Sequence, residues 1–262
     1  MRRLLVIALG LLVIVAAAFV AASFYRGRRL RAEGELTKAA ERGDAAAVRT
    51  LVAGGEDVNA RDKGYTPLAF AARAGDAETV NALLDAGADP NLRDCAQGWT
   101  PLLHAIHKHQ REAARALVMR GADVNARAGD CGQENVESGR TPLMFAAVYD
   151  DAEMVKFLLE RGADPRAEYD GANALSHAVG GAALGKLDDI DRAATNPCPV
   201  ETVRALLAKA PDLRIKQTVL DRATTYIVER KCPEVARLLN NRPAAPQQSP
   251  PGGGQTVSTR GR

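Results

Sequence analysis

Apolar and polar positions along this chain follow a pattern that recurs every 32–41 residues. In each period a short run rich in Ala and Leu comes first. A Gly or an acidic residue interrupts it, and a second run follows in which apolar residues recur at helical spacing, as Val80, Leu83 and Leu84 do. This spacing predicts an amphipathic helix. Two such runs per period predict about six helix pairs over residues 34–242.

Two short motifs mark the same period. The motif Gly-x-Thr-Pro-Leu begins at Gly64, Gly98 and Gly139, and a degraded copy begins at Gly171. The second motif is Gly-x-Asp followed by two residues, the last of which is Asn in three of its four copies. Its copies begin at Gly55, Gly87, Gly121 and Gly162. Two motifs that repeat in phase indicate an array of equivalent structural units.

Each motif has a local physical cause. Thr before Pro predicts a helix start, because the hydroxyl caps a free N–H and Pro at the first helical position has no N–H to leave unpaired. Gly75 and Asp76 are expected to end one helix and begin the next. Gly87 is expected to end the second helix in the left-handed conformation, which Gly adopts at little cost.

The chain resembles the ankyrin-repeat family, whose repeat has a period of about 33 residues and a Thr-Pro-Leu-His-x-Ala pattern. The resemblance implies an all-α solenoid of about six helix-turn-helix units. Residues 34–62 and a unit ending near residue 239 are expected to cap its ends, and the fifth unit carries an insertion at about residues 180–197. The sequence departs from the pattern at the motif His, which is Ala69, Leu103 and Met144 here.

An uncharged run over residues 4–25 precedes the repeats, and Arg residues flank it on both sides. Twenty-two residues of helix would measure about 33 Å, enough to cross a bilayer. We therefore expect an uncleaved single-pass transmembrane anchor within residues 1–31. The alternative is a signal peptide cleaved near Ala22, where small residues resemble a processing site.

Charge is unevenly distributed along the chain. Residues 1–31 carry six Arg and no acidic residue, and residues 242–262 carry three more Arg, which leaves the intervening body with a net charge of −6. An acidic body argues against nucleic acid as the main partner. We expect a repeat domain over residues 32–242. Residues 243–262, rich in Pro, Gly, Gln and Ser, are expected to be disordered.

By resemblance to the family, the partner would be a protein. Its contacts would come from the turn tips and from the carboxyl ends of the first helices. The tip positions are Tyr65, Trp99 and Arg140. Trp, Tyr and Arg are enriched at interface hot spots. The helix-end positions chosen for partner binding are Arg73, His107, Lys108, Val148 and Tyr149.

The four cysteines form two pairs at equivalent places in consecutive units. Neighbouring units should stack about 10 Å apart, so disulfides Cys95–Cys131 and Cys198–Cys232 are within reach if the loops bend. Disulfides imply an oxidising compartment. Four buried thiols are the alternative, and zinc is a weaker one because no close Cys-x-x-Cys occurs.

A second hypothesis is a metal- or redox-responsive envelope protein that uses His104, His107 and His109 or the cysteine pairs. No phosphate-binding Gly-rich loop and no catalytic motif of the common hydrolases occurs in the sequence. We therefore expect a monomeric, non-enzymatic binding module without a cofactor or a bound metal.

Orientation in the membrane rests on two conflicting cues. Four Arg follow residues 4–25 and two precede them, which favours a cytoplasmic body under the positive-inside rule. The paired cysteines favour the opposite side. We expect a periplasmic body, with the cytoplasmic face of the membrane, or secretion after cleavage, as alternatives.

Overall fold

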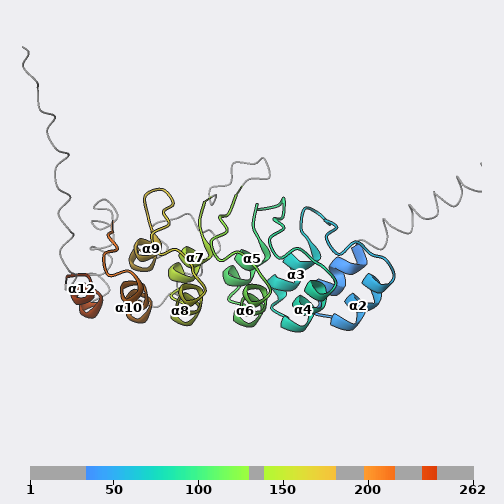
Figure 1. Ribbon diagram of the computed structural model, residues 1–262, viewed down its shortest axis with the longest axis horizontal. Helices are drawn as coiled ribbons and strands as arrows, with labels where there is room; N and C mark the ends of the chain where they lie inside the picture. The colour runs from blue at the N-terminus through green and yellow to red at the C-terminus, as the bar shows by residue number, and fades with distance from the viewer. Residues whose placement is uncertain (1–33, 130–138, 181–197, 216–231, 241–262) are drawn as a thin grey trace, which may run out of the picture.

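The computed structural model describes residues 34–129, 139–180, 198–215 and 232–240. Within these residues the chain forms a single elongated row of helix pairs (Figure 1). The helices and one short helical stretch over residues 34–41 account for its regular structure. No strand occurs among the described residues, which contain only two isolated β-bridges. The all-α prediction is confirmed for this part of the chain.

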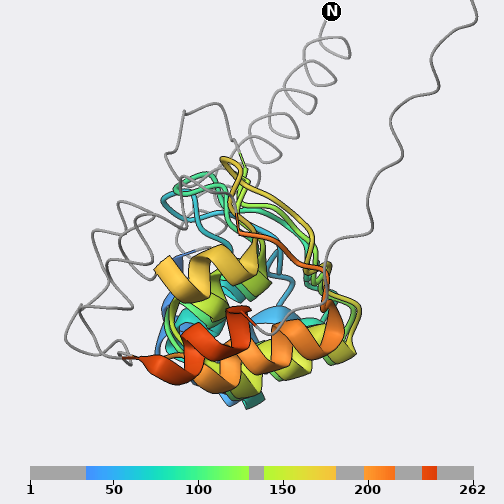
Figure 2. The same ribbon diagram turned by 90° about the vertical axis from the view of Figure 1, so that its left-hand side faces the viewer.

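The helices form two layers. The first helices of the units are α3 (Pro67–Ala74), α5 (Pro101–His107), α7 (Pro142–Val148) and α9 (Ala174–Gly180). The second helices are α2 (Ala45–Ala53), α4 (Ala77–Asp85), α6 (Arg111–Met119), α8 (Ala152–Glu160), α10 (Val200–Lys209) and α12 (Pro233–Asn240). In Figure 1 the first helices lie in one row above the second helices, and the connecting turns project from the top. Figure 2, viewed along the row, shows successive units superposed.

The predicted caps determine where the helices begin. The hydroxyls of Thr66, Thr100 and Thr141 accept hydrogen bonds from the backbone N–H three residues later, and Pro follows each Thr. In the fifth unit Asn173 replaces Thr and accepts from the backbone N–H of Ser176. The degraded fourth copy of the motif therefore still begins a helix.

Between the paired helices, Gly75 has a φ of 86° and ends α3, and the side chain of Asp76 caps α4. Gly87 follows α4 with a φ of 89°, as predicted from the motif. The same left-handed position after α5 and α7 is held by His109 and Asp150, with φ values of 58° and 53°. Left-handed backbone at a non-Gly residue is uncommon and is disfavoured by roughly 1–2 kcal/mol.

A small-residue core holds the layers together. First helices pack on first helices (α3 on α5, α5 on α7, α7 on α9), and second helices pack likewise where α2 meets α4 and α8 meets α10. Many of the buried contacts are Ala and Leu, such as Ala71, Leu83, Leu102 and Leu158. Small side chains allow the helix axes to approach closely, which suits a stacked array.

The second motif joins each unit to the next through its Asn. The side-chain amide of Asn59 donates to the carbonyl of Gly87, and its side-chain oxygen accepts from the N–H of Asp89. Asn91 and Asn125 repeat both bonds one unit further on. In the fourth copy Arg166 stands where Asn would, and its guanidinium binds the side chain of Asp212 at 2.5 Å. The motif is therefore a connection between units as well as a turn.

Cys198 and Cys232 are joined by a disulfide with their Cα atoms 5.6 Å apart. They precede α10 and α12 and so tie the second helices of consecutive units, the pairing that the sequence analysis favours. Cys95 is also disulfide-bonded. Cys131 lies outside the described residues, so the Cys95–Cys131 pairing stays a prediction.

Several other predictions fall on residues outside the description. These are the anchor at residues 4–25, the insertion at 181–197, the first helix of the sixth unit and the terminal stretch 243–262. In the part of the chain that is described, no helix is long and apolar enough to span a bilayer.

Candidate functional site

Tyr65, the residue before the Thr-Pro of the second unit, packs along its own first helix. The ring of Tyr65 is 5.1 Å from that of Phe70 in α3, and the guanidinium carbon of Arg73 lies 5.7 Å from the centre of the Tyr65 ring. Tyr65 and Arg73 are both partly exposed. An aromatic face beside an accessible guanidinium is a surface that a protein partner can contact.

Trp99 occupies the same position in the next unit but is only 2% exposed. Its ring lies 5.2 Å from His104 and 4.9 Å from His107, both in α5, and 5.3 Å from Phe145 in α7. The prediction that Trp99 contacts a partner is therefore wrong. The large indole fills the space between two units, where its burial stabilises the stack.

His107 and Val148 are also buried, with exposures of 8% and 4%. Nδ1 of His107 lies 2.5 Å from the hydroxyl oxygen of Tyr149, a hydrogen bond between the third and fourth units. Neither side chain is available to a partner, so both predicted contacts are corrected. Each residue lies one position before the partly exposed residue that follows its helix, Lys108 or Tyr149. Because a helix has 3.6 residues per turn, a shift of one position moves a side chain from an exposed face to a buried one.

Arg140, the tip residue of the fourth unit, is 3% exposed, and the predicted partner contact is wrong for it as well. Its guanidinium carbon lies 5.4 Å from the centre of the Tyr169 ring of the following turn. The same cation affects His177 in α9. Burial, followed by the charge of Arg140, lowers the pKa of His177 to about 4. Arg140 thus belongs to the contact between the fourth and fifth units.

Lys108 and Tyr149 remain partly exposed, and His109 is exposed. The ring of His109 packs edge-on against that of Tyr149 at 4.6 Å. These three residues and Arg73 lie at the carboxyl ends of α3, α5 and α7, and together with Tyr65 they form a surface that we call the rim. The sequence predicted His109 as a metal or redox candidate and not as a partner contact, although it follows His107-Lys108 directly.

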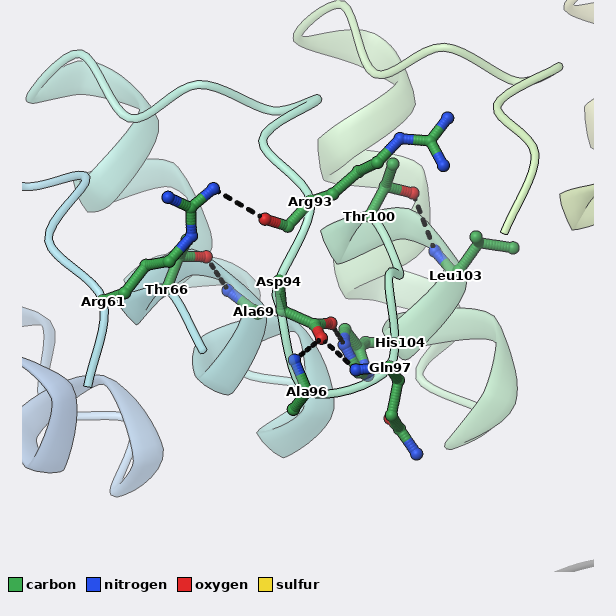
Figure 3. A network of polar contacts seen from close by, with 10 residues as sticks. All are labelled: Arg61, Thr66, Ala69, Arg93, Asp94, Ala96, Gln97, Thr100, Leu103 and His104. Atoms are coloured by element: carbon green, nitrogen blue, oxygen red, sulfur yellow. Dashed lines mark hydrogen bonds and ion pairs between the residues drawn. The ribbon is translucent and has the colours of Figure 1, made fainter. Parts of the chain in front are cut away.

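A buried acid–base pair that the sequence did not reveal joins Asp94 to His104, the residue on which Trp99 packs (Figure 3). One carboxylate oxygen of Asp94 contacts Nε2 of His104, and the other accepts from the backbone N–H groups of Ala96 and Gln97. Burial opposes ionisation of Asp94 most strongly. The hydrogen bonds from His104 and from the two backbone groups nevertheless hold its pKa below the usual range.

Burial lowers the pKa of His104, and the hydrogen bond and charge of Asp94 oppose this only in part. A neutral imidazole therefore donates to a carboxylate, and the pair closes the turn that carries Cys95. Its role is to shape this turn, because both side chains are fully buried.

The three neighbouring histidines do not converge on one point. His104 faces Asp94, His107 faces Tyr149, and His109 packs on the Tyr149 ring. No group of three or more His, Cys, Asp or Glu within the described ranges could hold a metal ion. The described residues thus give the metal-responsive hypothesis no support.

A row of arginines runs along the turns. Arg61, Arg93 and Arg127 each follow the Asn of the second motif by two residues. The guanidinium of Arg61 donates to the carbonyl of Arg93 at 3.0 Å (Figure 3), and that of Arg93 donates to the carbonyl of Arg127. Arg127 donates to the carbonyl of Glu168, the equivalent residue one unit further on, at 3.0 Å. The recurrence of Asn-x-Arg was the sequence signal for this row.

Comparison with known families agrees with this geometry. Residues 36–128 match the family model described as ankyrin repeats in three copies, and residues 138–169 match the model of a single ankyrin repeat. No curated protein matches the chain. The matched residues contain the rim, the buried Asp94–His104 pair and all three arginines of the row.

Proposed function

We propose that this chain, in which residues 36–128 and 138–169 match ankyrin-repeat models, is a protein–protein interaction module that binds its protein partner through the rim, without catalysing a reaction. The observation that carries this proposal is the arrangement of Tyr65, Arg73, Lys108, His109 and Tyr149. They are accessible in part or in full, and they come from three consecutive units.

The rim has the chemistry of an interface. Tyr65 and Tyr149 are held by neighbouring rings, and Tyr149 is also hydrogen-bonded to His107. Side chains that are already ordered lose little entropy when a partner binds. Arg73 and Lys108 add positive charge, which favours a partner surface with negative charge.

A photo-reactive amino acid placed at Lys108 tests the proposal. In cells that express the full chain, position 108 should form adducts with a protein partner. A matched probe at Lys156, an exposed lysine of α8 on the other layer, should not. Adding Tyr149→Ala to the probe at position 108 should abolish the adduct, because it removes a neighbouring contact. Equal adducts from both positions would contradict the assignment of the rim.

We further propose that residues 4–25 tether the module to a membrane and that the repeats lie on the oxidising side. The uncharged run supports the tether, and the Cys198–Cys232 disulfide supports the compartment. A reporter active only outside the cytoplasm, fused after Arg242, should be active. Thiol labelling of the natively expressed, denatured chain should detect no free cysteine. An inactive reporter together with labelled thiols would place the repeats in the cytoplasm.

A further inference from the structure

We propose that Arg61, Arg93 and Arg127 bind an extended acidic segment of the partner protein, with one carboxylate on each guanidinium. The inference rests on the proposed function and specifies the chemistry of the partner. It starts from the row described above, in which each arginine reaches to the same backbone position of the next unit.

The row is ordered before any partner binds. Each guanidinium is fixed by a hydrogen bond to a main-chain carbonyl of the following unit, and Arg127 also donates to the carbonyl of Gly139 at 3.2 Å. A guanidinium has five N–H donors. The carbonyl bonds occupy only some of them, so each arginine keeps donors for a ligand. Because the side chains are already held, binding costs less conformational entropy than it would for mobile arginines.

The charge of the row is not neutralised by the described part of the chain. None of the three guanidiniums forms an ion pair with a carboxylate among the described residues. Some exposed arginines elsewhere do form such pairs: Arg49 binds Glu78, Arg120 binds Asp85, and Arg204 binds both Glu201 and Glu234. Arg61 and Arg127 are exposed and Arg93 is partly exposed. Three ordered cations with no counter-charge among the described residues favour a ligand that supplies carboxylates.

The row has a definite end. At the equivalent position of the next unit the residue is Glu168, which is exposed and contributes only its backbone carbonyl to Arg127. A carboxylate there would repel an acidic ligand. The ligand is therefore expected to make three contacts and to stop short of the fifth unit.

The spacing of the row specifies the ligand further. Helices of neighbouring units pack about 8–10 Å apart, so equivalent side chains recur at about that interval. An extended polyproline-type segment advances about 9 Å in three residues. An acidic residue at every third position would thus place its carboxylates in register with the row. A β-strand, whose same-side residues recur about every 7 Å, fits less well.

We assign the acidic ligand to the partner protein. Residues 243–262 of this chain contain no Asp or Glu, so its own terminal stretch lacks the required charge. A strand of duplex DNA carries a negative charge about every 3.4 Å, which is much closer than the interval of the row. The spaced carboxylates of a peptide are the better match.

The proposal is tested with a fluorescent peptide of sequence Glu-Pro-Ser-Glu-Pro-Ser-Glu, titrated into the full chain in detergent. The control peptide Glu-Glu-Glu-Pro-Ser-Pro-Ser has the same composition and charge without the spacing. The spaced peptide should bind about tenfold more tightly, a difference of about 1.4 kcal/mol. Equal binding of the two peptides, or tighter binding of a single-stranded oligonucleotide of equal charge, would overturn it.

Matched variants of the protein complete the test. The triple variant Arg61→Gln, Arg93→Gln, Arg127→Gln keeps an N–H donor at each position but removes the charge, and it should lose binding of the spaced peptide. The control variant Arg49→Gln, Arg120→Gln, Arg204→Gln removes the same net charge from the second-helix layer and should bind as the wild type does. Equal loss in both variants would show that only net charge matters and would overturn the proposal.

Circular dichroism establishes that both variants fold. If the triple variant does not fold, Arg93→Lys alone replaces it; it keeps the charge but loses the planar fork and should bind several-fold more weakly. Unchanged binding in Arg93→Lys would overturn the proposal. If peptide binding fails while the probe at Lys108 still forms its adduct, the module binds a protein partner of different chemistry, so the two proposals fail separately.

Discussion

Units two and three have the same motif but use its tip residue in opposite ways. Tyr65 of unit two packs against Phe70 and Arg73, and against His104 of the next unit, but stays partly exposed, whereas Trp99 of unit three is buried against Phe145 of the next unit. Unit three also contains the buried pair Asp94–His104. A position that is open in one repeat is thus part of the core in the next, and the neighbouring unit decides which.

Truncation of the two tip residues should give the largest difference in the free energy of unfolding. Trp99→Ala should lower the free energy of unfolding by about 4 kcal/mol, because it leaves a cavity between two units. Tyr65→Ala should cost about 1 kcal/mol, since its ring is partly exposed already. Urea unfolding of the full chain followed by circular dichroism measures both. Similar losses would mean that the two positions are equivalent after all.

The second test removes the acid of the buried pair. Asp94→Ala should cost about 3 kcal/mol, because it leaves His104 buried without its partner and frees two backbone N–H groups of the turn. Asp62→Ala, at the equivalent position of unit two, should cost less than about 1 kcal/mol, because that side chain is partly exposed.

A double variant tests whether Asp94 and His104 stabilise the protein as a pair. His104→Phe restores the residue that units two and four have at this position, Phe70 and Phe145. Combined with Asp94→Ala, it should recover about 1–2 kcal/mol of the loss, because the buried imidazole that lacked its partner is no longer present. Strictly additive effects would show that Asp94 and His104 do not act as a pair.

The difference between units two and three also explains which features could be predicted from the sequence. Helix starts depend on neighbours within a few residues, so the caps at Thr66, Thr100 and Thr141 were predicted correctly. Burial at the tips depends on the next unit. Phe145 and Tyr169, which cover Trp99 and Arg140, follow them by tens of residues in the sequence.

The helix ends and the arginine row could be predicted from the sequence in part. The ends of α3, α5 and α7 were predicted within one residue, yet one residue separates the buried His107 from the partly exposed Lys108. The arginine row could have been found from the recurrence of Asn-x-Arg. Its hydrogen bonds to the next unit could not, because they require the distance between stacked turns.

The last prediction concerns the pH dependence of stability. It depends on His177 of unit five, which is at the helix position of Phe70 and His104. Its ordinary pKa of 6.5 falls to about 4 in the folded chain, through burial and then through the charge of Arg140. The unfolded chain therefore binds more protons between these two values, so this contribution to stability is present above about pH 6.5 and is lost as the pH falls towards 4. Between pH 7 and pH 5 the loss should be about 2 kcal/mol.

His177→Phe, which places at this position the residue of units two and four, should remove that part of the pH dependence. Urea unfolding at a series of pH values measures the slopes. His104 should contribute in the same direction, because burial lowers its pKa as well, although Asp94 opposes the shift. If His177→Phe keeps the wild-type slope, the buried site in unit five accepts a proton despite Arg140, and His177 does not contribute to the pH dependence of stability.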